Sequence, residues 1–253
     1  MDSAARLSTE ERDALDGLTA DLRRVFGARL HSVSAYGLHE PSASPRAVHS
    51  IALVERLTFQ DLSACAPLAV TWRRKSLAVP LILEQQEFLR TLDVFPLEYG
   101  DIIAHHVVVA GSDPFVDARV SPADIRRACE LGAKSHLIHL REGFLETGGD
   151  APTVARLIAA SAVPFRALLA NIARLADDRP QGDRLSFQQT DGNEDVAQTA
   201  ERHIGIPASV VRDVIGAGSG TQSSITDPTA SLSRYIAAVE KIWEYVDGWR
   251  GRA

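Results

Sequence analysis

The first apolar pattern along the chain has helical spacing. It predicts a helix from about Ser8 to Phe26, with Gly27 placed to end it. Ser8 and Glu11 have the spacing of a capping box at the start of this helix, in which each side chain binds the other residue's amide. The apolar face is formed by Leu15, Leu18, Leu22, Val25 and Phe26.

Shorter apolar runs follow the helix and predict a small sheet. Loose alternation or a continuous apolar run, bounded by glycine, proline or polar residues, is typical of strands. The predicted strands are Leu30–Tyr36, Ser50–Val54, Ala78–Leu83, Val94–Ile102 and a short edge strand at His106–Val109. Helices are predicted at about Thr58–Lys75 and Gln85–Leu92. This alternation indicates a mixed α/β sheet flanked by helices.

The pattern changes between residues 111 and 122, and only helical spacing continues beyond it. Ser121 is a candidate N-cap and Pro122 suits the first helical position. The predicted helices are Pro122–Glu146, Ala151–Asp177, Glu194–His203, Pro207–Ala217 and Pro228–Arg250, with loops at Arg179–Gly192 and Gly216–Pro228. We therefore predict an α/β domain in residues 1–118, followed by an antiparallel helical bundle in residues 119–253.

Composition and charge narrow the class of protein. The chain has 253 residues, of which 45% are hydrophobic and 24% charged, as in ordinary globular domains. A net charge of −6 gives no strong nucleic-acid signal. The polar N-terminus lacks the apolar core of a signal peptide, and the sequence suggests no membrane span, so a cytoplasmic location is expected. Cys65 and Cys129 are expected to be buried thiols without a disulfide.

Several segments, in order, resemble parts of the nucleotidyltransferase superfamily. FGARLHSVSAYG resembles the family's helix end, strand and glycine turn, and LAVPLILEQQEF resembles its third strand. DVFPLEYGDIIAHHVVVAGSDPF resembles a strand ending in a G-x-D-P turn, and IRRACELGAKSHLIHLREGFL the first helix of a following bundle. The layout is similar to nucleotidyltransferase-domain proteins of the kanamycin-nucleotidyltransferase type, which implies a nucleotidyltransferase-like first domain.

The resemblance implies a specific chemistry. Active members place a Gly-Ser turn against the nucleotide phosphates and an Asp-x-Asp or Asp-x-Glu pair on the next strand. Alternate positions on a strand share one face, roughly 7 Å apart, so the two acids can share divalent metals. A third acid comes from a later strand. The metals stabilise both the attacking and the leaving oxygens.

This chain departs from that pattern at the decisive positions. The turn reads Tyr36-Gly37-Leu38-His39, so the phosphate-binding serine is replaced by leucine, and these four residues are the nucleotide-binding candidates. The acid pair falls on Ser50 and Ala52, or in the other register on His49 and Ile51. The third acid could be Glu98, with Asp101 nearby. No metal site is therefore expected, and Ser50, Ala52 and Glu98 are remnant positions without a catalytic role.

Other polar residues have simpler explanations than a site. Gly37 suits a tight turn, and Glu98 an exposed or ion-paired strand residue. His105 and His106 would point to opposite faces of a strand, and His136 and His139 suit packing or capping in the bundle. Arg126 and Lys134 are each four residues from Glu130, which favours intrahelical ion pairs. Phosphate-loop, dinucleotide-binding, zinc-protease and serine-hydrolase motifs are not found.

Three hypotheses follow. The leading one is a catalytically inactive protein that binds a nucleotide, another small molecule or a partner in a cleft between the domains, without a cofactor. The alternative is an active nucleotidyltransferase using Mg²⁺ and a nucleoside triphosphate, with Glu40, Glu55 and Glu98 as a non-standard acidic set. The third is a homo-oligomer built on apolar faces of the bundle.

Overall fold

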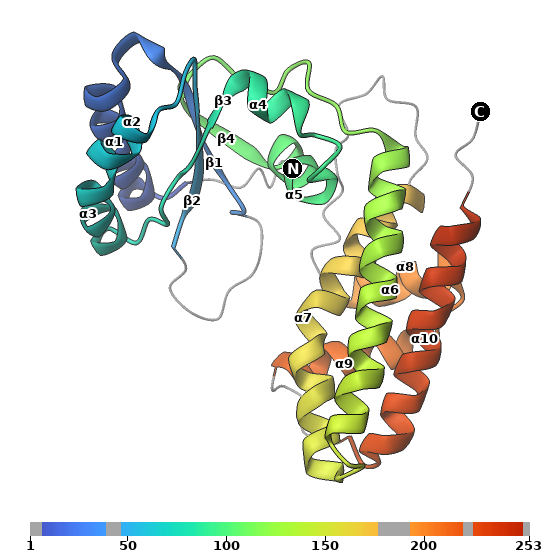
Figure 1. Ribbon diagram of the computed structural model, residues 1–253. Helices are drawn as coiled ribbons and strands as arrows, with labels where there is room; N and C mark the ends of the chain where they lie inside the picture. Colours follow the sequence, from blue (N-terminus) through green and yellow to red (C-terminus); the bar gives the residue numbers. More distant parts are fainter. Residues whose placement is uncertain (1–6, 39–46, 177–192, 220–224, 250–253) are drawn as a thin grey trace. The chain divides into compact units, whose positions relative to one another are not determined.

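The computed structural model describes residues 7–38, 47–176, 193–219 and 225–249 (Figure 1). The chain divides into two compact units, Met1–Val120 and Ser121–Ala253. The first unit contains the sheet and the second contains helices, so the predicted fold class of a small mixed sheet followed by an antiparallel helical bundle is confirmed. The boundary predicted after residue 118 lies two residues before this division.

The first unit is built on a four-stranded sheet with strand order β3-β2-β1-β4. β1 pairs antiparallel with β2 and with β4, whereas β2 and β3 are parallel, so the sheet is mixed. The strands are β1 (Leu30–Tyr36), β2 (His49–Val54), β3 (Leu81–Glu84) and β4 (His106–Gly111). The strand predicted from residue 78 begins only at Leu81 because Pro80 has no N–H to donate to β2.

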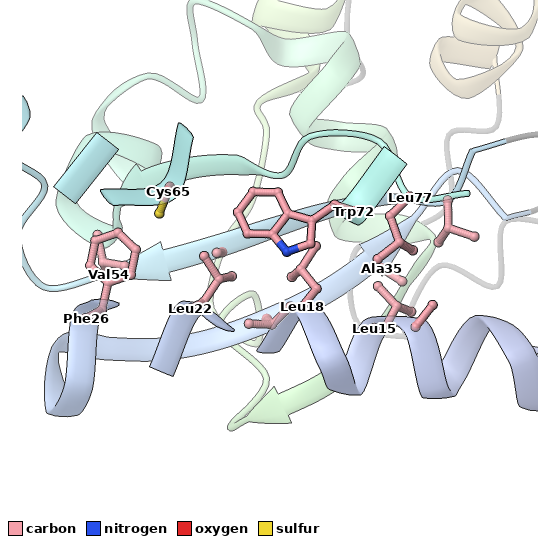
Figure 2. Close-up of a cluster of buried hydrophobic side chains, with 13 residues drawn as sticks. Leu15, Leu18, Leu22, Phe26, Ala35, Val54, Cys65, Trp72 and Leu77 are labelled. Carbon is pink, nitrogen blue, oxygen red and sulfur yellow. The ribbon is translucent and has the colours of Figure 1, made fainter. Parts of the chain in front are cut away.

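One face of the sheet is covered by α1 (Thr9–Phe26), α2 (Phe59–Cys65) and α3 (Ala69–Arg74). α1 begins at the predicted capping box, in which Glu11 N donates to Ser8 Oγ and Ser8 N to Glu11 Oε2. Figure 2 shows its leucines pointing toward the sheet beside the ring of Trp72. This cluster, the α1-side core, includes Leu15, Leu18, Leu22, Phe26, Val33, Ala35, Ala52, Val54, Cys65, Trp72 and Leu77.

The helix predicted over Thr58–Lys75 is interrupted. A 3₁₀ turn at Ala66–Leu68 separates α2 from α3, because Pro67 cannot donate the hydrogen bond that a continuous helix needs. The Asp61 carboxylate anchors α2 to the sheet by accepting two hydrogen bonds from Arg29, at 2.7 and 2.9 Å. Those bonds and two from Thr58, donated by its hydroxyl and its backbone N–H, hold the pKa of Asp61 well below its usual range.

The other face is covered by α4 (Gln85–Arg90), α5 (Pro96–Ala104) and residues 112–118. Phe88 lies at the centre, with ring centroids 4.6 Å from Tyr99 and 5.1 Å from Phe115. We call this second cluster the α5-side core; its buried members are Ile51, Leu53, Phe88, Tyr99, Ile102, Phe115 and Ala118.

The strand predicted over Val94–Ile102 is wrong: most of this segment is the helix α5. Its β-branched and aromatic residues are typical of strands, but Pro96, Tyr99 and Ile102 are buried at intervals of three residues. Pro96 also occupies a first-turn position, where its missing N–H costs nothing. The helix prediction for α4 and the edge-strand prediction for β4 are confirmed.

The second unit is a bundle in which all five predicted helices form. They are α6 (Pro122–Glu146), α7 (Ala151–Ala176), α8 (Asn193–Ile204), α9 (Ala208–Ser219) and α10 (Pro228–Gly248). Ser121 caps α6 by accepting from Asp124 N, as predicted. The predicted loop at Arg179–Gly192 lies outside the described residues, as do residues 220–224 of the second loop.

α7 is the central helix of the bundle and contacts the four others. Its segment Ala151–Ala173 is long and apolar enough to cross a membrane by length and composition alone, whereas the sequence analysis suggested no membrane span. A core helix of a bundle meets the same criterion, and Ile158, Phe165 and Ile172 are buried here among other helices.

The glycine-rich stretch after residue 215 was predicted to end a helix and open a loop, but α9 continues through Ser219. A Cβ added at Gly218 would lie 2.4 Å from the Cβ of Ala162 on α7. This glycine therefore permits close packing between α9 and α7 rather than chain flexibility.

Candidate functional site

The strand–turn–strand motif forms as predicted between β1 and β2. β1 ends at Tyr36, which pairs with His49, the first residue of β2. Gly37 has a φ of +68°, a conformation that favours glycine, so the turn explains this residue without a ligand. His39, the last nucleotide-binding candidate, lies outside the described residues.

Tyr36 and Leu38, on either side of Gly37, have different surroundings. Tyr36 is half-buried, its ring centroid is 5.6 Å from that of His49, and burial raises the pKa of its phenol. Leu38 packs against the α1-side core. The position where the resemblance implies a phosphate-binding serine is therefore an apolar anchor for the turn.

Ser50 and Ala52 face the α1-side core. Ala52 is a fully buried member of it, and alternation along β2 places Ser50 on the same face. Their partners on β1 are Ala35 and Val33, which belong to the same core. Ser50 is 1% exposed and its hydroxyl has no hydrogen-bond partner. In this register, the two remnant positions have neither carboxylates nor solvent access.

The other register places the pair on the opposite face. Ile51 is 1% exposed and belongs to the α5-side core, so one position of this pair is closed as well. His49 is partly exposed and lies beside Tyr36 at the end of the sheet. In this register the pair therefore consists of a partly exposed imidazole, His49, and a buried isoleucine, Ile51.

Glu98 is not on a strand, contrary to the sequence prediction. It lies in the first turn of α5, where a carboxylate suits the positive end of the helix dipole. The strand beside β2 is β3, and its acid, Glu84, pairs with Val54 at the end of β2 remote from the turn. Glu84 Oε1 accepts a hydrogen bond from Leu57 N at 2.9 Å. Neither the predicted residue, Glu98, nor the acid of β3, Glu84, therefore occupies a strand position beside Ser50.

The acidic set of the active alternative is not brought together by the described residues. Glu55 follows β2 at the end opposite Gly37, and Glu98 belongs to a helix. Glu40 lies outside the described residues. Within the part of the chain that the structure describes, no three His, Cys, Asp or Glu side chains are grouped to hold a metal ion.

A row of three side chains across the end of the sheet was not anticipated. Tyr36 pairs with His49 on one side and with His106 on the other, so all three lie on one face. His106 has its ring 4.8 Å from Phe115, edge to face. Its Nδ1 is 3.0 Å from Ile103 O and its Nε2 is 3.1 Å from Asp113 Oδ1. His106 therefore links α5 to the segment after β4. The row of three side chains can be recognised only from the pairing of the strands.

The same face also carries a pocket of about 330 Å³ that sequence reasoning missed. It lies near the start of β1, toward the end of the strand remote from Gly37. Residues of β1, α4 and the segment after β4 line it, so chain positions more than fifty residues apart meet there. The sequence predicts a turn at Gly111–Pro114 but gives no sign that it lines a pocket.

The histidines and cations of the bundle have structural partners. His136 Nε2 shares a 2.5 Å hydrogen bond with the Tyr235 hydroxyl, and its ring stacks on Phe165 with a centroid distance of 6.0 Å. The packing role predicted for His136 is thus confirmed. Arg126 forms the predicted ion pair with Glu130 at 3.0 Å. Lys134 instead lies over the Trp243 ring, 4.0 Å from its centroid.

The two cysteines also have structural roles. Cys65 and Cys129 are both buried and neither forms a disulfide, as predicted. Burial raises the pKa of the Cys65 thiol, which disfavours the reactive thiolate. Neither residue is therefore assigned to a site.

Comparisons with known proteins give a limited result. No protein-family model matches the chain, and no curated protein matches it in sequence. Among solved structures, the chain is similar to spectinomycin adenyltransferase AAD(9) from Enterococcus faecialis, crystallised with ATP and spectinomycin. The alignment covers 91% of this chain and 98% of that one, with 10% sequence identity and a TM-score of 0.48.

Proposed function

We propose that the chain is a nucleotidyltransferase-fold protein that does not catalyse nucleotidyl transfer and acts by binding a ligand or a partner. The observation that carries this proposal is the burial of Ser50 and Ala52 in the α1-side core, where active members of the superfamily would hold metal. Metal-dependent transfer needs oxygen ligands that reach both the metal and the nucleotide phosphates. A serine hydroxyl and a methyl group within a closed core supply neither.

The burial of Ser50 and Ala52 also argues against a metal site in which other acids replace the missing pair. A carboxylate at either position would have to be buried among leucine and tryptophan side chains, which is costly without a compensating charge. The nearest alternative acids, Glu55 and Glu84, lie beyond or at the opposite end of β2. At the end of β1, Tyr36 is half-buried beside His49, and its phenol is the group that we assign to stacking on a ligand or hydrogen-bonding it.

The proposal is tested with the full chain, Mg²⁺ and each of the four ribonucleoside triphosphates. We expect no release of pyrophosphate above a no-protein control. Isothermal titration under the same conditions measures whether nucleotide binds at all, and a Tyr36→Ala variant reports whether binding uses the turn. Mg²⁺-dependent turnover that disappears in Glu98→Ala would overturn the proposal and favour the active alternative.

A second candidate function, self-association through the bundle, is favoured by one surface. Leu131, Ile138 and Leu145 recur every seven residues on α6 and are 72%, 42% and 78% exposed. Seven-residue spacing puts them on one stripe of the helix, as in helix–helix contacts. Light scattering over a range of concentrations tests it: a dimer that Ile138→Ser dissociates supports the hypothesis, and a monomer at all concentrations excludes it.

A further inference from the structure

One wall of the pocket on the α5-side face of the first unit is the segment after β4, which hydrogen bonds hold in place. Gly111 turns the chain back at the end of β4 with a φ of +82°, and a Cβ there would lie 2.1 Å from His31 O. Asp113 Oδ1 then accepts a hydrogen bond from Phe115 N at 2.9 Å, and the Phe115 ring is buried in the α5-side core. Arg119 Nη1 donates to Val116 O and Ala118 O at 2.9 and 2.7 Å. The wall is therefore pre-organised without being a helix or strand.

The floor of the pocket contains a polar group without a partner. Ser32 on β1 lines the pocket, is 2% exposed, and its hydroxyl makes no hydrogen bond within the protein. A buried hydroxyl without a partner costs free energy, and a ligand atom would remove that cost. Beside it, His31 Nδ1 donates to Gln85 Oε1 at 2.6 Å, which fixes the Gln85 amide and leaves its Nε2 as a donor.

The carboxylates Asp113 and Asp117 are the acidic groups of the lining, and His31 is its other titratable side chain. Asp113 and Asp117 are both on the wall, and none of the described lining residues is a lysine or arginine. Arg119, next along the chain, directs its guanidinium to backbone carbonyls rather than into the lining. The rim is apolar, with Leu89 and Val116 38% and 56% exposed. The pocket thus combines carboxylates, a buried hydroxyl and an apolar edge.

We propose that this pocket binds a small amine, a ligand with a protonated amino group on a compact apolar body. The ammonium group pairs with the Asp117 and Asp113 carboxylates, a polar atom of the ligand satisfies the Ser32 hydroxyl, and the apolar body packs on Leu89 and Val116. A volume of about 330 Å³ suits a ligand of this size. The site is separate from the Gly37 turn and does not depend on the function proposed above.

The test is a titration of the ¹⁵N-labelled full chain with 2-phenylethylamine, followed by amide chemical shifts. We expect saturable shifts confined to residues 31–32, 85–89 and 112–118, which line the pocket, with a dissociation constant on the order of millimolar, as for a ligand of few atoms. 2-Phenylethanol, which lacks the charge, and 3-phenylpropanoate, which reverses it, are expected to bind at least about fivefold more weakly. Added salt should weaken amine binding because the carboxylates are partly exposed.

Matched variants locate the site. Asp117→Asn and Ser32→Ala are expected to weaken amine binding, by about fivefold for the exposed carboxylate. Asp93→Asn removes an exposed carboxylate outside the pocket, and Ser34→Ala removes another buried, unpartnered hydroxyl from β1, so neither should change binding. Dispersed spectra for all four variants establish that they fold. Equal affinity for the amine and the alcohol, unsaturable shifts, or wild-type binding by Asp117→Asn and Ser32→Ala would each overturn the proposal.

Discussion

At the scale of single residues, the departures from the superfamily pattern are accommodated as core packing. Ala52 contributes a methyl group to the α1-side core, and Leu38 anchors the turn on it. Ser50 is the exception, because its hydroxyl is buried without a partner. These positions are closed by neighbouring side chains, so an acid introduced at either of them would be buried in the core.

We therefore expect Ala52→Asp to destabilise the protein by about 3 kcal/mol or more, since an unpaired carboxylate would be buried among apolar side chains. Urea unfolding followed by tryptophan fluorescence measures this, because Trp72 lies in the same core. Ser50→Ala serves as the control and should be neutral or slightly stabilising, because it removes an unsatisfied hydroxyl. A stable Ala52→Asp protein that gains Mg²⁺-dependent transfer would contradict the closed geometry.

His136 makes the stability of the bundle depend on pH. Burial is the main cause that lowers its pKa from 6.5 to about 4, and the nearby His139 adds to it. The unfolded state then binds one more proton than the folded state between these values, so stability falls as pH decreases from about 6.5 to about 4. Below that range the loss is complete. With allowance for partial exposure, it amounts to about 2 kcal/mol.

Thermal unfolding between pH 7 and pH 4 checks this dependence. His136→Gln should lose the part of the slope that His136 causes, since glutamine does not titrate. His139→Gln, on the exposed side of the same helix, should keep most of it, because burial is a larger cause of the lowered His136 pKa than His139 is. An unchanged slope in the His136 variant would assign the pH dependence to other groups.

At the scale of elements, α5 decides where Glu98 lies and what covers one face of the sheet. The segment has the composition of a strand, yet its buried residues follow a helical period. Tertiary packing of Tyr99 and Ile102 against Phe88 selects the helix. Glu98 is consequently carried onto the first turn of a helix rather than into the sheet.

Gly100→Ala distinguishes the two structures for this segment. In the interior of α5 a Cβ at this position meets only Val120 Cγ2, at an ordinary 3.8 Å. Alanine should therefore stabilise the first unit by about 0.5–1 kcal/mol, measured as a rise in its unfolding midpoint. Gly37→Ala is the opposing control: its φ of +68° strains alanine, so stability should decrease. Loss of stability in Gly100→Ala would argue against the helix.

At the scale of the whole molecule, each unit has its own hydrophobic core. The α1-side and α5-side cores are formed within Met1–Val120, and α7 gathers the other helices within Ser121–Ala253. A unit with a complete core can fold independently. The Gly37 turn and the pocket at Ser32 are therefore expected to persist without the bundle.

Expression of residues 1–120 and 121–253 as separate chains tests this independence. We expect both to unfold cooperatively, with a mixed α/β circular dichroism spectrum for the first and a helical one for the second. The intact chain, which retains both units, provides the reference midpoints. A fragment that is unfolded alone but folds when the other is added would show that its core is completed by the other unit.

Most of the local structure is predictable from short-range features of the chain. Caps and periodicity placed α1 and the five bundle helices, because Ser8, Ser121 and regular apolar spacing act within a few turns of chain. The sequence also shows that Ser50 and Ala52 are not acids, because it is enough to align one turn and one strand with the family pattern. The conclusion that nucleotidyl transfer is not expected rests on those residues.

Tertiary structure decided what local pattern could not. The helix at α5, the continuation of α9 past Gly218 and the helix break at Pro67 depend on packing partners or on a single missing donor. The direction in which Ser50 and Ala52 point follows from which face α1 covers. The row of His49, Tyr36 and His106 and the pocket at Ser32 exist only because strand pairing and the Gly111 turn unite distant segments, a relation that no local spacing encodes.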